Sequence, residues 1–530
     1  MSSYPVHPSA SSRPATPTRG NTRFAALLIL LLTAAIALVW SHVKLLSQDE
    51  IFVLQTDSVS SIRELIHIQR SYPISLDPLL YHLLAHACTK ILGPTALALR
   101  LPSLFGFLLM QLCIFFATRR IAGPRAALIA TGFPALTATL FYAPEARPYG
   151  LLLGLYALTF LCWQTATRRV ASPESSRTGP LLLLAISIAL TINSHYFGIL
   201  LLIPLCLAEF ARTIQRRRLD FPLLLAILIG IAGVLATLPF QHAAAEFRKH
   251  YYNAGAITLH AISQAYRSLF VNYSTQPLSI QRLADIVLIL LAIALVVLCA
   301  MHLHRKTADL PTPELVFLLA LAALPLFGVL LAVFVTHSIE VRYVLSALIA
   351  VAIFVAIAVA PWLGNRTVWA TFFMLLVVGI VFSGILRIRD QQRQTANQLA
   401  SLILTPDLKA QLLALPDSRL YIQDMGHFEF TSYYEPDPNV RSRMTLLYSR
   451  DEELRYDRHD TASLTAEHMS HFTGFTITPY AQLRNQPGEH MLVLYHSGWD
   501  WTDQALTTDA QITPLGPTLG GNAVLVRFRH

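Results

Sequence analysis

Two adjacent carboxylates, Asp49 and Glu50, follow the first long apolar run of the chain, which extends from Phe24 to Trp40. They therefore lie where a chain that leaves a lipid bilayer would meet water. Acidic side chains at such a boundary are costly to bury and have no packing role, which favours a role in chemistry. Taken alone, the pair is more simply a solvated loop that ends a helix, so its meaning depends on the rest of the chain.

Other polar residues occur at the ends of later apolar runs. The positions of the basic loops place these residues at the same membrane face as the two acids. One carboxylate could remove the proton of an acceptor hydroxyl, and arginines could hold a leaving phosphate with their planar fork. Singly, each has a plainer explanation, such as an ion pair between Glu145 and Arg147 or contact of Arg342 with lipid headgroups. Together they suit sugar transfer from a lipid phosphate carrier. The set comprises Asp49, Glu50, Glu145, Arg147, His195, Tyr196, His337, Glu340, Arg342 and Tyr343.

The composition indicates a polytopic α-helical membrane protein. Of the 530 residues, 54% are hydrophobic and 13% are charged, which is about half the charged fraction of an ordinary soluble domain. The net charge of +9 comes largely from short loops between apolar runs, so it does not indicate nucleic-acid binding. None of the five cysteines follows Cys299, and the polar C-terminal region therefore needs no disulfide.

The alternation of apolar runs and basic loops predicts the topology. Residues 1–22 form a disordered cytoplasmic tail, and residues 23–390 form a membrane domain of about eleven helices whose first run is retained rather than cleaved. Arginine and lysine lie in every second loop, which places the N-terminus inside and loops 47–94 and 241–282 outside. The predicted spans are residues 24–40, 95–118, 126–142, 149–166, 180–194, 196–210, 221–240, 283–303, 314–336, 342–361 and 367–386.

The outer segments carry structure of their own. Within loop 47–94, apolar residues at helical spacing from Val59 to Ile66 predict a helix in the interface plane, and a second is expected from Leu79 to Leu92. Residues 391–530 are expected to form a soluble extracytoplasmic α/β domain. Its predicted strands lie at 419–423, 490–495 and 522–528.

Several stretches resemble the GT-C superfamily of integral-membrane glycosyltransferases. The resemblance is greatest to the bacterial branch similar to protein O-mannosyltransferases (dolichyl-phosphate-mannose-protein mannosyltransferases) and to the lipid A aminoarabinose transferase. Asp49-Glu50 after the first helix looks like the family's opening motif, and Asp77-Pro-Leu-Leu-Tyr-His-Leu-Leu-Ala-His86 is similar to its hPPLYYLLLH stretch. Ala98-Leu-Arg-Leu-Pro-Ser103, Glu145-Ala-Arg-Pro-Tyr149 and Arg342-Tyr343 resemble three further family motifs. The likeness is good over residues 24–150 and loose over 150–390.

The resemblance implies an inverting enzyme that takes a sugar from a polyprenyl-phosphate donor at the periplasmic face of a bacterial inner membrane. The acceptor would be a lipid, glycan or protein hydroxyl. Asp49 would be the catalytic base, Glu50 a neighbour that orients the site, and Glu145 an acid near the acceptor. Arg147 and Arg342 would hold the donor phosphate. The substrate-side candidates are His82, Tyr149, His195, Tyr196 and Tyr343.

The sequence departs from the family pattern at Leu79 and His82, where a second proline and a second tyrosine are usual. A divalent cation, Mg²⁺ or Mn²⁺, would be held by Asp49 and Glu145 if the protein uses one. Two adjacent acids at a low-dielectric boundary also predict that one of Asp49 and Glu50 has a raised apparent pKa.

Two other functions are weighed against the enzyme. A transporter or flippase of lipid-linked sugars is the main alternative, but transporters usually place ionisable residues near the bilayer midplane. Here the predicted helix interiors are nearly free of charge. A non-catalytic glycan-binding scaffold would leave Asp49 and Glu50 without a role.

Overall fold

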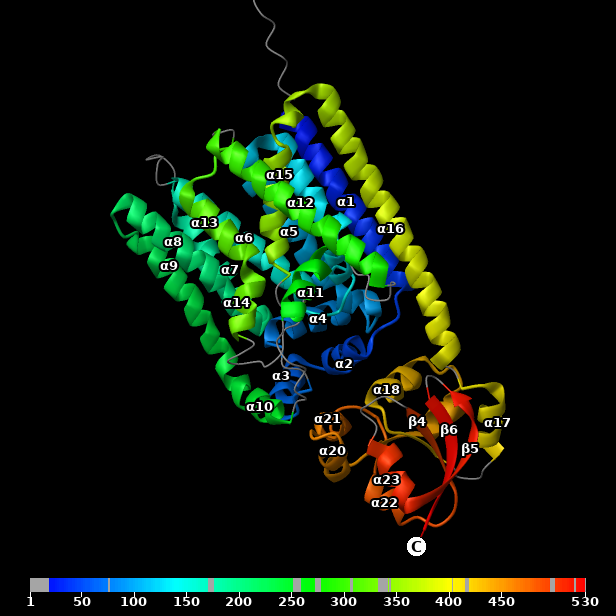
Figure 1. Cartoon of the computed structure of the whole chain (residues 1–530). Helices are drawn as coiled ribbons and strands as arrows, with labels where there is room; N and C mark the ends of the chain where they lie inside the picture. The colour runs from blue at the N-terminus through cyan, green and yellow to red at the C-terminus, as the bar shows by residue number, and fades with distance from the viewer. Residues whose placement is uncertain are drawn as a thin grey trace, which may run out of the picture.

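The computed structural model describes residues 19–74, 77–169, 176–250, 259–271, 278–305, 308–331, 342, 345–402, 404–414, 419–495, 501–518 and 521–529. The described part comprises a bundle of long apolar helices and a separate C-terminal α/β domain at one end of the bundle (Figure 1). Of the tail predicted for residues 1–22, residues 1–18 lie outside the described part, and helix α1 begins at Arg19.

The membrane bundle confirms the predicted apolar runs. Seven helices are long and apolar enough to cross a membrane, and shorter apolar helices overlap the remaining runs. A break separates the spans predicted at 180–194 and 196–210. The backbone at His195 is extended there, and a short 3-10 helix follows it. The bundle helices are α1 (Arg19–Val43), α5 (Ala96–Leu136), α6 (Tyr149–Arg168), α7 (Thr178–Ser194), α8 (Leu202–Arg216), α9 (Phe221–Ala232), α12 (Leu278–His304), α13 (Thr312–Ala322), α14 (Leu324–Leu331), α15 (Ala347–Val359) and α16 (Arg366–Leu402).

Helix α5 unites the second and third predicted spans. Its backbone leaves helical geometry at Gly123, where φ is +86°, a value that glycine adopts at no steric cost. Pro124 follows directly and cannot continue the hydrogen-bond pattern of the preceding turn. Two consecutive spans, as predicted, are therefore joined by a sharp break.

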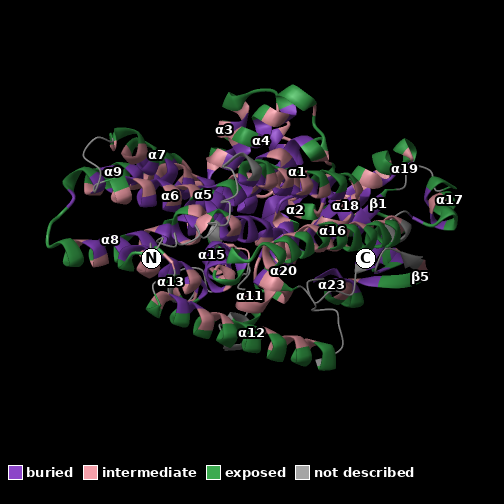
Figure 2. Ribbon diagram, turned by 90° about the horizontal axis from the view of Figure 1, so that it is seen from above, coloured by how far each residue is buried: buried purple, intermediate pink, exposed green. Residues whose placement is uncertain are grey.

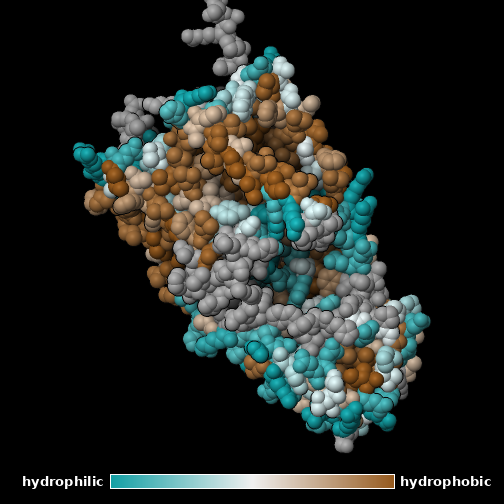
Figure 3. All heavy atoms as spheres, viewed as in Figure 1, coloured by the Kyte–Doolittle hydropathy of each residue, from teal (hydrophilic) through white to brown (hydrophobic). Residues whose placement is uncertain are grey.

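Apolar side chains cover the outside of the bundle. Residues coloured as exposed run along α9, α12 and α16 (Figure 2), and many of them are large and apolar. Figure 3 shows these hydrophobic residues gathered on the bundle, with hydrophilic residues over the C-terminal domain and the adjoining end. An apolar surface of this extent is stable in lipid and not in water.

Helices α5 and α6 approach so closely that only glycine fits between them. A Cβ atom built on Gly154 would lie 2.3 Å from the Gly106 carbonyl oxygen, and one on Gly106 would lie 2.3 Å from Leu151 Cα. Small residues at four-residue spacing allow such backbone contact between membrane helices. The same contact fixes the segment that precedes α6, since the Ser103 hydroxyl donates to the Arg147 carbonyl oxygen.

Replacing Gly154 with leucine should therefore lower the free energy of unfolding by about 1–3 kcal/mol or more, because the added atoms meet backbone that cannot rotate away. The check is the midpoint of thermal unfolding in detergent. Gly179→Ala is the matched control, since a Cβ there meets nothing within 4 Å. Equal midpoints for the two variants would contradict the prediction.

Five helices lie at the end of the bundle that faces the C-terminal domain: α2 (Gln48–Asp57), α3 (Ile62–Ser71), α4 (Leu79–Leu92), α10 (Leu238–Lys249) and α11 (Leu259–Phe270). Helix α4 confirms the prediction for Leu79–Leu92, and α3 starts at Ile62 rather than near Val59 because Ser61 caps it. Helix α2 was not predicted. Asp49 and Glu50 belong to its first turn instead of a loop.

The C-terminal domain is built on a six-stranded sheet with strand order β3-β2-β1-β4-β6-β5. Strands β1 to β4 are parallel, and β6 and β5 complete the sheet in antiparallel pairing. The α/β prediction is thereby confirmed. The strands are β1 (Leu420–Ile422), β2 (Met444–Tyr448), β3 (Ile477–Pro479), β4 (His490–Tyr495), β5 (Ala510–Thr518) and β6 (Gly521–Phe528).

Short helices cover this sheet and link it to the bundle. They are α17 (Pro406–Ala414), α18 (Met425–Tyr434), α19 (Pro438–Arg443), α20 (Arg450–Tyr456), α21 (Thr461–Ser470), α22 (Tyr480–Arg484) and α23 (Trp501–Asp509). The Leu46 amide donates to the Tyr434 hydroxyl at 2.7 Å, and Phe52 packs against the core of the C-terminal domain. Helix α16 is continuous to Leu402, so the predicted domain boundary at residue 390 falls inside a helix.

Candidate active site

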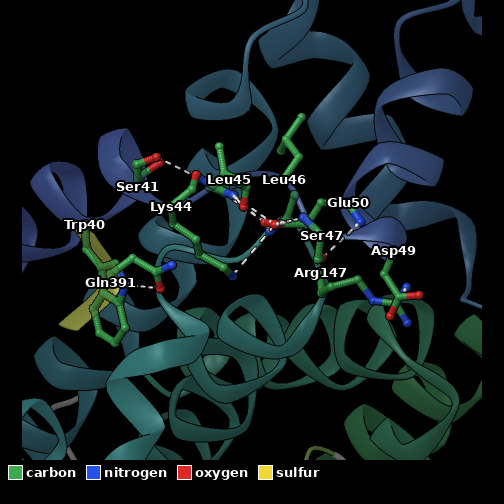
Figure 4. A network of polar contacts seen from close by, with 12 residues as sticks. Trp40, Ser41, Lys44, Leu45, Leu46, Ser47, Asp49, Glu50, Arg147 and Gln391 are labelled. Atoms are coloured by element: carbon green, nitrogen blue, oxygen red, sulfur yellow. Dashed lines mark hydrogen bonds and ion pairs between the residues drawn. The ribbon is translucent and has the colours of Figure 1, made fainter. Parts of the chain in front are cut away.

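The first turn of α2 separates the two adjacent acids. Ser47 caps the helix, and the Glu50 side chain turns back to accept from the Ser47 amide at 3.0 Å. This reciprocal capping box requires the third residue of the helix to point toward the cap. Successive helical residues differ by about 100° in direction, so Asp49 points elsewhere. Figure 4 shows Asp49 beside Arg147 and Glu50 beside Ser47.

Glu50 forms a buried ion pair rather than part of an open site. Its side chain is 0% exposed and accepts from Nε and Nη2 of Arg100, both at 2.8 Å. Arg100 also donates to three backbone carbonyls at the end of α1 and just after it, those of Ser41, Lys44 and Leu45. Every N–H direction of this guanidinium is thus used to hold the end of α1 against the starts of α2 and α5.

The pKa of Glu50 is lowered, so Glu50 is not the acid whose pKa the adjacent pair was predicted to raise. Burial alone would raise the pKa of Glu50, but the charges of Arg100 and Lys44 and two kinds of hydrogen bond lower it to about 2. Like-charge repulsion does not dominate, because the two carboxylates diverge and Glu50 has a cation of its own. Glu50 therefore positions the site and is not available to accept a proton.

Asp49 and Arg147 form the exposed centre of the candidate site. The Asp49 side chain is 45% exposed, and its Oδ2 lies 3.3 Å from Nη1 of Arg147. Nη2 of Arg147 lies 3.6 Å from Asp77 and 3.4 Å from the Tyr149 hydroxyl. Burial opposes the charge of Arg147, but Tyr149, Asp77 and Asp49 raise its pKa well above the usual value. A permanently charged arginine thus lies beside a half-exposed carboxylate.

Glu145 and Lys44 lie next to this centre with unused hydrogen-bonding capacity. Within the described residues, neither the buried Oε2 of Glu145 nor the buried Nζ of Lys44 has a hydrogen-bond partner. Burial raises the pKa of Glu145 to about 6, with Lys44 and Arg147 opposing and Glu50 and Asp49 adding to the rise. Nζ of Lys44 lies 3.7 Å from Glu50 and 4.4 Å from the ring centre of Phe141.

His195 borders the same site from the break after α7. Its Nε2 lies 3.6 Å from Asp77, and its Nδ1 accepts from the Phe197 amide at 3.1 Å. Burial lowers the pKa of His195 to about 4; Asp77 opposes this shift, and Arg147 and Arg342 add to it. The imidazole is therefore neutral near pH 7. Its ring centre lies 5.6 Å from that of Tyr149.

The remaining predicted residues are placed less centrally or lie outside the described part. His82 is buried and holds Asp57 at 2.8 Å, which ties α4 to the end of α2. Tyr196 begins the 3-10 helix after His195. Arg342 is close enough for its charge to act on His195. His337, Glu340 and Tyr343 lie outside the described residues.

Three residues near the site were not predicted from the sequence. Asp77 opens the stretch that resembles a family motif, and Arg100 lies within another, so both had a signal in the sequence. Lys44 had a weaker one, as a lysine between the first apolar run and Asp49. Within the described residues, no group of three or more His, Cys, Asp or Glu side chains is arranged to hold a metal ion. The prediction of a divalent cation stays a prediction.

Comparison with known proteins defines the class. The whole-chain architecture matches the crystal structure of ArnT from Cupriavidus metallidurans in the apo state, with a TM-score of 0.60 at 13% identity. The match covers 95% of this chain and 98% of that one. ArnT from the same organism bound to undecaprenyl phosphate gives a TM-score of 0.56 at 13% identity, covering 94% and 97%. The protein is thus a multi-pass membrane protein with the GT-C fold.

Part of the sequence also matches a known family. Residues 77–240 match the family model described as dolichyl-phosphate-mannose-protein mannosyltransferase. This match covers the part of the chain that holds most of the candidate site, and the chain is similar to that family there. The matched range contains Asp77, Arg100, Glu145, Arg147 and His195. An oligosaccharyltransferase of Archaeoglobus fulgidus shares 12% identity with a TM-score of 0.48, over 88% of this chain and 68% of that one. No curated protein sequence matches the chain.

Proposed function

We propose that the protein is an inverting glycosyltransferase that moves a sugar from a polyprenyl-phosphate donor to a hydroxyl acceptor. The observation that carries the proposal is the pairing of a half-exposed carboxylate, Asp49, with a charged arginine, Arg147, at 3.3 Å. A base and a phosphate-binding cation are the two groups that such a transfer needs. The family model and the ArnT structure bound to undecaprenyl phosphate support a lipid-phosphate donor.

In the proposed reaction, each residue of the site has a step. Asp49 accepts the proton of the acceptor hydroxyl as its oxygen attacks the anomeric carbon. The bond from that carbon to the phosphate oxygen breaks on the opposite side, and polyprenyl phosphate leaves as an anion, so the anomeric configuration inverts. Arg147 binds this phosphate, assisted by Lys44 and by Arg342.

The setting and the acceptor are part of the proposal. The polar residues of the site lie at the end of the bundle that meets the C-terminal domain, and the distribution of basic loops makes this end periplasmic in a bacterial inner membrane. The acceptor is a lipid, glycan or protein hydroxyl. A Mg²⁺ or Mn²⁺ ion, if used, would bind at Asp49 and Glu145, whose unpartnered oxygen is a suitable ligand.

Purified protein in lipid vesicles with polyprenyl-phosphate sugars tests the proposal. We expect stoichiometric release of polyprenyl phosphate and a glycosylated acceptor with inverted anomeric configuration. Heat-inactivated protein is the control for spontaneous donor hydrolysis. Vectorial movement of the intact donor across the vesicle, without release of polyprenyl phosphate, would instead support a flippase.

The raised pKa of Glu145, about 6, predicts the pH dependence. Above this pH Glu145 is ionised, and its negative charge strengthens Asp49 as a base; below it, Glu145 is neutral and that assistance is lost. The rate of transfer should therefore fall as the pH decreases through about 6. In Glu145→Gln this inflection should disappear, leaving a lower rate that is flat in this range. An unchanged inflection in the variant would assign it to another group.

A further inference from the structure

Glu429 is a buried acid of the C-terminal domain with an unusual lack of hydrogen-bond contacts to its carboxyl group within the described residues. It lies in α18 with 0% of its surface exposed, and within the described residues neither carboxyl oxygen is hydrogen-bonded. Burial of a polar group without a partner is strongly unfavourable. A leucine would fill the same position without that cost, so the carboxyl group is not explained by packing.

Other buried acids of the same domain have hydrogen-bonded oxygens, although Oε2 of Glu435 has no partner within the described residues. Both oxygens of Glu453 accept backbone amides, at 3.0 Å from Ala462 and 2.8 Å from Ser463. Asp460 is held by His250 and Arg450, both at 2.7 Å. Glu429 differs from these buried acids in that neither of its oxygens has a hydrogen-bond partner within the described residues.

The packing of α18 places Glu429 against the start of α2. Gly426 precedes Glu429 by three residues and lies on the same helix face, and a Cβ atom built there would be 2.5 Å from Gln48 Oε1. Farther along α18, the Tyr434 hydroxyl binds the Leu46 amide. Glu429 thus lies near Asp49, the residue that follows Gln48. Its pKa is raised well above the usual range, by burial first and then by the charge of Asp49.

We propose that Glu429 is an acceptor-binding residue supplied by the C-terminal domain. This inference rests on the proposed function and names its acceptor class: a sugar, which presents a second hydroxyl next to the one that reacts. Asp49 takes the proton of the reacting hydroxyl, and Glu429 hydrogen-bonds the neighbouring hydroxyl without exchanging a bond or a proton with it. Two carboxyl groups on two packed elements match two adjacent hydroxyls better than a single alcohol.

The test compares Glu429→Leu and Glu429→Gln with wild type, and uses Thr431→Val as a matched control. Thr431 lies on the same helix, is 1% exposed, and its hydroxyl also lacks a partner within the described residues. The acceptor probes are lipid A, as a sugar lipid, and a peptide with one serine. Donor hydrolysis by water gives a rate that requires no acceptor contact.

We expect Glu429→Leu to raise KM for the sugar acceptor on the order of tenfold, the effect of losing one hydrogen bond of ordinary strength. Donor hydrolysis should be unchanged, and the unfolding midpoint should stay equal or rise because a buried unpartnered acid is removed. Glu429→Gln, which still forms hydrogen bonds, should recover part of the acceptor affinity. Thr431→Val should leave acceptor KM at the wild-type value.

Two results would overturn the inference while leaving the proposed function intact. One is a lower unfolding midpoint for Glu429→Leu with unchanged acceptor KM, which would make the residue structural. The other is a preference of the wild-type protein for the serine peptide over lipid A. Wild-type protein that neither transfers nor hydrolyses the donor sugar would refute the proposed function and this inference together.

Discussion

Replacement of Asp49 by asparagine is expected to lower kcat for sugar transfer by about 10²–10⁴-fold, the usual contribution of a general base. The substitution preserves size and hydrogen-bonding shape but removes the group that accepts the proton. Arg147, the proposed ligand of the donor phosphate, keeps its contact with Asp77 at 3.6 Å. Donor affinity should therefore stay within a few-fold of wild type, and a binding assay with polyprenyl phosphate checks this separately from turnover.

The control for Asp49→Asn is Asp407→Asn, an exposed acid in the first turn of α17. Its turnover should equal that of wild type. Retention of full activity by Asp49→Asn would move the base to another group, and Glu145 is then the next candidate because its unpartnered oxygen lies in the same site.

Replacement of Glu50 by leucine should lower the free energy of unfolding by about 3–5 kcal/mol, the usual cost of leaving one member of a buried ion pair without its partner. Arg100 would keep its three carbonyl contacts but lose both bonds to the carboxylate. Denaturant unfolding of the protein in detergent measures the change. Because Glu50 also accepts from the Ala146 amide at 2.8 Å, activity should fall as well.

The double variant Glu50→Leu with Arg100→Met separates the buried charge from the lost packing. If the cost in Glu50→Leu comes from an unpaired guanidinium, the second substitution should restore part of the stability. Two fully additive losses would contradict that explanation.

The same ion pair sets an acid limit on stability. The folded-state pKa of Glu50, about 2, lies below its ordinary value of 4.5. Its stabilising contribution is therefore complete above pH 4.5 and is lost as the pH falls toward 2. In Glu50→Leu, this part of the pH dependence should be absent.

The architecture was readable from the sequence because burial in lipid leaves a strong compositional signal. Apolar runs at Ala96–Leu136 or Leu278–His304 have few alternatives to a membrane helix. The strands near His490 and Asn522 were likewise predicted from their β-branched and aromatic content. The juxtaposition of Asp49 with Arg147 followed from topology, since both end up at the same end of the bundle.

The different positions of Asp49 and Glu50, one exposed and one buried, had a local signal in the sequence that composition does not show. Ser47 and Glu50 form the S-x-x-E capping box, which indicates that Glu50 turns back toward the helix start. Its partner Arg100 is 50 residues away, and no spacing rule predicts a contact of that kind. His82 could not be assigned for the same reason, because its contact with Asp57 depends on how α4 packs on α2.

The position of α18 has a consequence for the biosynthesis of this protein. Residues 425–434 are made after all the bundle helices that the structure describes, yet they cover the start of α2 near the N-terminal end of the chain. During synthesis, the bundle can therefore form while the side of α2 that carries Asp49 is still uncovered. The contacts between α18 and the start of α2 can form only after α18 has been translated and folded.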